Sequence, residues 1–133
     1  IDRDVESAGK GKSYSETVLG KQSARGTISC DQVDTILARI TPTDDFALLE
    51  GCDLIIEAVF EDIDIKAEIT RKAEAIIPAT TVYASNTSTL PISTLAEASA
   101  RPDQFIGLHF FSPVDRMGLV EIIKGVKTSP ATG

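Results

Sequence analysis

Asp53-Leu-Ile-Ile-Glu-Ala-Val-Phe60 is the stretch of this chain that decides the fold. It is an almost continuous apolar run, which is typical of a parallel β-strand covered on both faces. Apolar residues then recur at helical spacing and predict a helix that begins at Asp62 and ends at Pro78. A second buried strand is predicted over residues 81–84. Strand, helix and strand in this order indicate an α/β fold with a mainly parallel sheet.

The flanking segments extend this pattern in both directions. Downstream, we expect a short helix over residues 92–98 and strands over 105–111 and 119–123. Upstream, a polar helix closed by Gly26 and a second helix capped by Ser29 predict a helical hairpin. Residues 40–43 suggest a short strand and turn, and residues 44–50 a helical turn closed by Gly51. The 133 residues suit one domain or part of a larger one.

Composition excludes several classes of function. The net charge of -7 argues against a nucleic-acid surface, because phosphate binding requires clustered Lys and Arg. No signal peptide and no apolar run of membrane-spanning length is present, so we expect no membrane partner. Cys30 and Cys52 stand in unlike contexts and are interpreted as reduced thiols. His109 is the one histidine, without partners at ligand spacing, so we expect no metal site.

Polar residues that directly follow the buried strands are the candidates for chemistry, because ligands of parallel sheets bind beyond the carboxyl ends of the strands. Ala84-Ser-Asn-Thr-Ser-Thr89 follows one strand, and its plainest interpretation is a turn with helix capping. His109 lies at the end of another strand. Alternation of side chains along that strand puts Gly107 on the same face, where we expect it to leave space for a ligand beside the imidazole. His109 is either a hydrogen-bonded core residue or a general base. Glu121 is a carboxylate in an apolar strand, where it either faces water or orients a histidine ring.

Together these stretches resemble the 3-hydroxyacyl-CoA dehydrogenase family. The resemblance is carried by Ser-Asn-Thr-Ser after a strand, by Gly107-Leu-His-Phe-Phe-Ser-Pro113 and by Leu119-Val-Glu-Ile-Ile123, at spacings that agree with that family. Asp53-Leu-Ile-Ile-Glu-Ala-Val-Phe-Glu61 is similar to the family's fourth-strand motif. The resemblance covers most of the chain and is weakest over the first forty residues. It implies that residues 1–133 form part of a Rossmann-like NAD-binding domain, incomplete at its N-terminus, with flanking helices and a helical hairpin arm.

The resemblance also implies roles for individual residues. His109 would take the proton from the substrate 3-hydroxyl, Glu121 would hold and polarise the imidazole, and Ser88 would hydrogen-bond the substrate oxygen. The residues that would contact NAD are Glu61, Lys66, Asn86, Ser88, Ser112 and Asp2 or a residue just upstream of it. Ser13 and Lys21, in the hairpin, would contact coenzyme A.

The implied activity is oxidation of (3S)-3-hydroxyacyl-CoA to 3-oxoacyl-CoA with NAD, as in fatty-acid β-oxidation. The alternatives are a non-catalytic, crystallin-like module of the same fold and a Ser-His-Glu hydrolase. The hydrolase lacks support because Ser88 is not in a Gly-x-Ser-x-Gly elbow. The resemblance further implies a homodimer or a multifunctional β-oxidation protein, located in the bacterial cytoplasm or the mitochondrial matrix.

Several departures from the family pattern bear on activity. Ser112 stands where an Asn is common. The family's glycine-rich phosphate loop would precede Ile1, and its C-terminal helical domain, which supplies most of the dimer interface, would follow Gly133. We therefore expect these 133 residues alone to be an inefficient enzyme.

The isolated chain 1–133 should bind NAD weakly. The pyrophosphate of a dinucleotide normally lies on backbone N–H groups at the first helix N-terminus, and these groups are absent from this stretch of sequence. Calorimetric titration of the 133-residue chain with NAD would measure this. A micromolar dissociation constant would contradict the expectation.

Overall fold

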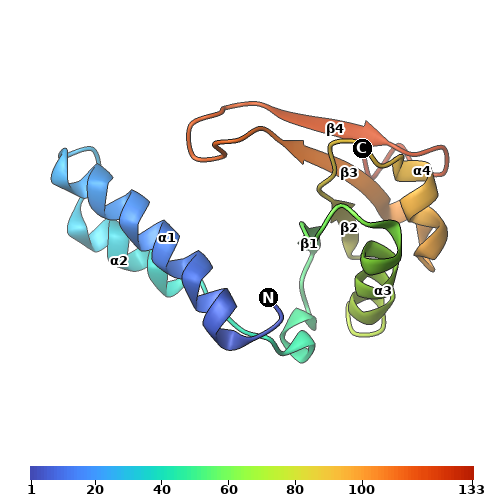
Figure 1. Cartoon of the computed structure of the whole chain (residues 1–133), viewed down its shortest axis with the longest axis horizontal. Helices are drawn as coiled ribbons and strands as arrows, with labels where there is room; N and C mark the ends of the chain where they lie inside the picture. Colours follow the sequence, from blue (N-terminus) through green and yellow to red (C-terminus); the bar gives the residue numbers. More distant parts are fainter. The chain divides into compact units, whose positions relative to one another are not determined.

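The computed structural model describes all residues, 1–133, and they form two compact units, Ile1–Phe46 and Ala47–Gly133 (Figure 1). No helix in it is both long enough and apolar enough to cross a membrane. Both cysteines are free thiols.

The N-terminal unit is a helical hairpin, as predicted. It consists of α1 (Val5–Ala24) and α2 (Cys30–Ala38). The Asp4 carboxylate caps α1 by accepting a hydrogen bond from the Ser7 amide, and Ser29 forms a capping box with Gln32 at the start of α2. Gly26 follows α1 with a φ of 71°, a left-handed conformation that favours glycine. Neither helix contains a buried residue, although α2 carries the apolar residues Val33, Ile36 and Leu37.

The strand expected at residues 40–43 is absent, and that prediction was wrong. These residues run as irregular chain, where the Thr43 carbonyl accepts one hydrogen bond from the Asp2 amide. Pro42 has no backbone N–H, so it cannot donate to a sheet ladder. The helical turn expected next is a short 3-10 helix, η1 (Phe46–Leu49), followed by Gly51 with a φ of 83°.

The second unit contains a four-stranded sheet in the order β1-β2-β3-β4. Its strands are β1 (Leu54–Glu57), β2 (Val82–Ser85), β3 (Phe105–Phe110) and β4 (Val120–Lys124). The first three are parallel, and β4 pairs antiparallel with β3. The predicted α/β architecture with a mainly parallel sheet is therefore confirmed.

The helices of this unit connect the parallel strands and pack on the sheet. They are α3 (Ile63–Glu74), α4 (Ile92–Leu95) and the 3-10 turns η2 (Ala96–Ala98) and η3 (Pro102–Gln104). Asp62 caps α3 by accepting hydrogen bonds from the amides of Asp64 and Ile65. Contacts link α3 to β1, and α4 to β3 and β4. The core includes the stacked rings of Tyr83 and Phe105, with centroids 5.4 Å apart.

The two faces of the sheet are covered unequally. One face meets α3 and α4. On the other, the apolar side chains of the outer strands are exposed: Leu54 47%, Ile56 46%, Val120 40% and Ile122 59%. The expectation that the first strand is covered on both faces is thus wrong for the face that carries Leu54 and Ile56. Both helices of this unit pack on the same side, because they contact each other.

Gly107 lies where α4 presses closest to the sheet. A Cβ atom added at this residue would be 2.6 Å from Ile92 Cδ1 and 3.0 Å from Ile123 Cβ. The sequence predicted a different role for Gly107, which was to leave space beside His109 for a ligand. That expectation was wrong, because Ile92 and Ile123 fill the space. The glycine instead permits close packing of helix on strand.

Gly107→Ala should destabilise the protein by about 1–3 kcal/mol, because both neighbouring side chains must shift to accommodate one methyl group. Gly118→Ala is the matched control, since nothing lies within 4 Å of the corresponding Cβ position. Urea unfolding of both variants measures the difference. Equal unfolding midpoints for the two would show that the packing around Gly107 adapts without cost.

Candidate active site

The polar groups of the candidate site gather at the carboxyl ends of the parallel strands. In register, Glu57 of β1 pairs with Ser85 of β2, which pairs with Gly107 of β3. β1 and β2 therefore end at the same level, and β3 continues beyond this level to Phe110. The loops that follow them carry Glu61 and Ser88, and His109 lies near the end of β3.

His109 is held between a carboxylate and a hydroxyl. Strand pairing places it directly opposite Glu121, whose Oε2 lies 2.7 Å from His109 Nδ1. The other ring nitrogen, Nε2, lies 3.1 Å from Ser88 Oγ. A carboxylate can only accept, so Nδ1 carries a proton in this arrangement, and in the neutral ring Nε2 is left as an acceptor. The structure thus brings together the three predicted catalytic residues, Ser88, His109 and Glu121.

The exposure of this triad suits a site that a ligand can reach. The His109 side chain is 19% exposed and that of Glu121 is 54% exposed. The ring of Phe111 lies beside the imidazole, with centroids 4.6 Å apart and planes tilted by 49°. His109 therefore has one aromatic neighbour, two polar partners and partial access to solvent. It is not a fully buried core histidine.

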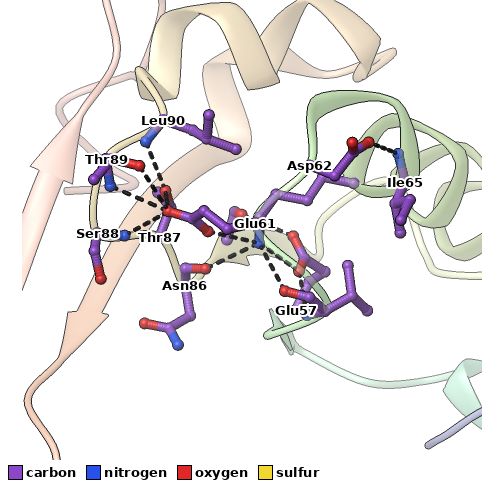
Figure 2. A network of polar contacts seen from close by, with 12 residues as sticks. Glu57, Glu61, Asp62, Ile65, Asn86, Thr87, Ser88, Thr89 and Leu90 are labelled. Carbon is purple, nitrogen blue, oxygen red and sulfur yellow. Dashed lines mark hydrogen bonds and ion pairs between the residues drawn. The ribbon is translucent and has the colours of Figure 1, made fainter.

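Glu61 organises the loop that carries Ser88. Its Oε1 accepts hydrogen bonds from the Ser88 amide at 2.9 Å and the Thr89 amide at 3.1 Å, and also from the Thr87 hydroxyl (Figure 2). Burial raises the pKa of the Glu61 carboxyl, but these three hydrogen bonds and the charge of Lys66 outweigh burial and lower it from 4.5 to about 2. The group is thus ionised at neutral pH, while its side chain stays 38% exposed.

Lys66 and Glu57 form a buried ion pair beneath this loop. Lys66 Nζ lies 2.8 Å from Glu57 Oε1, and the side chains are 1% and 2% exposed. The ammonium also donates to the carbonyl oxygens of Asn86 at 3.0 Å and Val59 at 3.4 Å. Lys66 was expected to contact NAD. The structure places its charge inside the protein, with Glu61 Oε2 at 3.8 Å.

Asn86 connects three strand ends. Its amide donates to the Glu57 carbonyl at 2.7 Å, and its Oδ1 accepts a hydrogen bond from the Phe110 amide at 3.3 Å. The backbone that leads to Ser88 is therefore tied to β1 and to β3, next to His109.

Four further residues were predicted to contact the cofactor or the substrate. Ser112 is exposed and follows β3. Asp2, Ser13 and Lys21 are exposed residues of the N-terminal unit. Their contacts with cofactor or substrate stay predictions. No group of three or more His, Cys, Asp or Glu side chains is arranged to hold a metal ion.

Glu57, Thr87 and Thr89 belong to this network, and the sequence patterns do not single them out. For Glu57 a signal existed, because a carboxylate inside an apolar strand needs a partner. The same signal pointed to Glu121. The two threonines look like ordinary turn residues, and only their common partner, Glu61, distinguishes them.

A parallel sheet with polar groups at its carboxyl edge, and a histidine oriented by a carboxylate, are features of dinucleotide-dependent oxidoreductase domains. Residues 1–133 match the family described as "3-hydroxyacyl-CoA dehydrogenase, NAD binding domain", and the chain belongs to this family. NAD is accordingly its cofactor, and the Rossmann-like fold predicted from the sequence is confirmed.

Solved structures agree with this assignment. (S)-3-Hydroxybutyryl-CoA dehydrogenase from Ralstonia eutropha superposes with a TM-score of 0.96 at 34% identity, over 99% of this chain and 47% of that one. 3-Hydroxybutyryl-CoA dehydrogenase from Escherichia coli K12 gives a TM-score of 0.94 at 28% identity, over 98% and 28%. The dehydrogenase part of a multifunctional enzyme from C. elegans gives 0.75 at 33%, over 88% and 28%. The chain thus spans less than half the length of each.

Replacement of Glu61 by Gln should lower stability most at neutral pH. The folded-state pKa of about 2 lies below the ordinary value of 4.5, so the carboxylate contributes its full stabilisation above the higher value and loses it as pH falls towards the lower. The difference between the urea midpoints of wild type and variant should therefore stay constant from neutrality to about pH 5 and shrink as pH falls from there towards about 2. A difference that stays constant over the whole range would contradict this.

Proposed function

We propose that the complete protein oxidises (3S)-3-hydroxyacyl-CoA to 3-oxoacyl-CoA with NAD, in fatty-acid β-oxidation. The observation that carries the proposal is the hydrogen-bonded line from Ser88 Oγ through the His109 ring to Glu121 Oε2, with steps of 3.1 and 2.7 Å. Bound NAD would accept the hydride that leaves the carbon bearing the hydroxyl.

In this mechanism His109 is the general base. A substrate 3-hydroxyl between Ser88 Oγ and His109 Nε2 would take the place of the present contact between those atoms. The substrate would donate its proton to Nε2 and accept a hydrogen bond from Ser88. Glu121 stabilises the imidazolium that forms, because its carboxylate already accepts the Nδ1 proton.

The polar groups of Glu61, Asn86 and Ser88 are also suited to binding a dinucleotide. Glu61 keeps a half-exposed carboxylate that can accept hydrogen bonds from ribose hydroxyls, while its Oε1 binds the loop. Asn86 and Ser88 present amide and hydroxyl groups beside it. We assign these three residues to NAD binding, with Ser112 and Asp2 as further contacts. Ser13 and Lys21 would contact the coenzyme A moiety.

A hydrolase is the less suitable function for the same three side chains. Ester or thioester hydrolysis through Ser88 needs backbone N–H groups near the nucleophile to stabilise an oxyanion. The amides of Ser88 and Thr89 both donate to Glu61 instead, and a carboxylate there would repel a developing negative charge. A crystallin-like module would not need the hydrogen-bonded set at all.

The assembly belongs to the proposal as well. We infer either a homodimer, formed through a further helical domain, or a dehydrogenase part of a multifunctional protein. Size-exclusion chromatography with light scattering on the complete protein distinguishes these assemblies. NADH formation from (S)-3-hydroxybutyryl-CoA tests the activity itself, and a complete protein that binds NAD without such turnover would favour the non-catalytic module.

His109→Gln should lower kcat by about 10²–10⁴-fold, the usual contribution of a positioned acid–base group. Folding should barely change, because Gln has a similar volume and the site is partly exposed. The absorbance of NADH measures the rate, and circular dichroism shows whether the variant is folded. A folded variant with wild-type turnover would remove His109 from the mechanism.

Glu121→Gln should lower kcat while NAD affinity stays nearly unchanged. The amide can still hydrogen-bond the imidazole, but it lacks the charge that stabilises the imidazolium. Steady-state kinetics together with NAD titration separates the two effects. Unchanged turnover would make Glu121 a solvated strand residue.

A further inference from the structure

The part of β3 that carries His109 has a neighbouring strand on one side only. On the other side, β2 pairs with β3 only as far as Ser85 and Gly107, and Gly107 precedes the histidine in the strand. β4 continues the pairing up to Phe110 and Val120, but β4 is itself an edge strand with all of its residues exposed. Strand pairing therefore supports His109 from the β4 side and leaves it without a strand on the β2 side.

The Asn86 side chain supplies a contact on the β2 side. Asn86 follows directly after β2, and its Oδ1 accepts a hydrogen bond from the Phe110 amide at 3.3 Å. That N–H belongs to the peptide unit that joins His109 to Phe110. Because a backbone N–H needs an acceptor, the side chain continues the hydrogen bonding of the sheet beyond the last residue that the β2 backbone pairs.

Asn86 can hold this peptide unit in place because its own backbone is fixed. Its amide donates to the Glu57 carbonyl at 2.7 Å, and its carbonyl accepts from the Lys66 ammonium at 3.0 Å. Figure 2 shows the Asn86 side chain extending away from Glu57. The short side chain of asparagine turns about few bonds and occupies discrete rotamers, so Oδ1 stays at a defined place relative to the backbone.

We propose that Asn86 is a positioning residue for His109, an inference that rests on the proposed dehydrogenase function. The imidazole must meet Glu121 on β4 and Ser88 in the loop after β2 at the same time, at 2.7 and 3.1 Å. Asn86 ties the strand that carries the histidine to the segment that carries the serine. A misplacement of about 1 Å in such a geometry can cost about 10²-fold in rate.

Two substitutions in the complete protein separate this role from a contact with NAD. Oδ1 of Asn86 accepts from the Phe110 amide, and Nδ2 is the group left to donate to the cofactor. N86A removes both groups, whereas N86D removes the donor and keeps an acceptor for the Phe110 amide. The contrast between the two variants therefore isolates the acceptor. The added carboxylate favours a protonated imidazole, so kcat is compared on the alkaline plateau of the pH profile, where His109 is deprotonated.

T128V is the matched control, at the opposite end of the same strand. The Thr128 hydroxyl donates to the Phe105 carbonyl at 2.7 Å and accepts from the Gly125 amide at 2.8 Å, so it ties the start of β3 as Asn86 ties the end. Thr128 and Asn86 are both half-buried. Valine keeps the shape of threonine and removes both hydrogen bonds, far along the strand from His109.

We expect N86A to lose on the order of 10²-fold in kcat, and N86D to recover most of that loss. Any change in KM for NAD should be the same in N86A and N86D, because both lack the donor. T128V should unfold at a lower urea concentration than the wild type, with kcat close to the wild-type value. In the ligand-free protein, the Phe110 amide should exchange with solvent faster in N86A than in N86D or the wild type. If N86A fails to fold, N86L, which keeps the volume and has no acceptor, carries the same expectations.

Wild-type kcat in folded N86A would overturn the positioning role. An equal loss of kcat in N86A and N86D would also overturn it, because the missing Nδ2 donor would then be responsible. The same holds for an equal loss in T128V, which would trace the effect to general destabilisation. Absence of dehydrogenase activity in the wild type would instead refute the proposed function. The exchange rates of the Phe110 amide would in that case still decide whether Asn86 holds the end of β3.

Discussion

The register of the three parallel strands is the constraint from which the rest of the site follows. Because Glu57, Ser85 and Gly107 pair across the sheet, β1 and β2 end at the same level, and β3 continues beyond it to Phe110. The loops after β1 and β2 must then pass close to the end of β3. The antiparallel pairing of β4 completes the arrangement, since it places Glu121 opposite His109 without any loop being involved. The histidine and its carboxylate thus stand on rigid elements, and only the serine stands on a loop.

Two charged side chains, one exposed and one buried, hold the loop that carries Ser88. Glu61 holds the amides of Ser88 and Thr89 from the solvent side, where it stays ionised down to low pH. Lys66 holds the Asn86 carbonyl from the interior. Two carboxylates flank one ammonium, so the cluster carries one net negative charge, and this charge resides on the exposed member. The buried charges hold the carboxyl edge of the sheet in place, and the exposed carboxylate of Glu61 is left to accept hydrogen bonds from hydroxyl groups.

Local sequence patterns were sufficient for most elements, though not for the strand expected at residues 40–43, and for the central side chains. The strands, the capped helices and the hairpin follow from apolar spacing and from residues such as Ser29 and Gly26, which act within a few positions. Contacts across the crossover connections were not predictable in this way. Glu57 and Lys66 meet because α3 folds back on β1, and Glu61 reaches Thr87 across 26 residues. Gly107 shows the same limit, because the pattern correctly placed it on the face of His109 but could not show that Ile92 occupies that space.

The exposed apolar side chains of β1 have a consequence for handling the molecule. Leu54 and Ile56 lie on β1, which is also an outer strand with one row of backbone donors and acceptors unpaired within the sheet. Exposed apolar side chains beside an open hydrogen-bonding edge are a template for adding another strand. A sample of these 133 residues should therefore self-associate as it is concentrated. It should also bind fluorescent hydrophobic dyes.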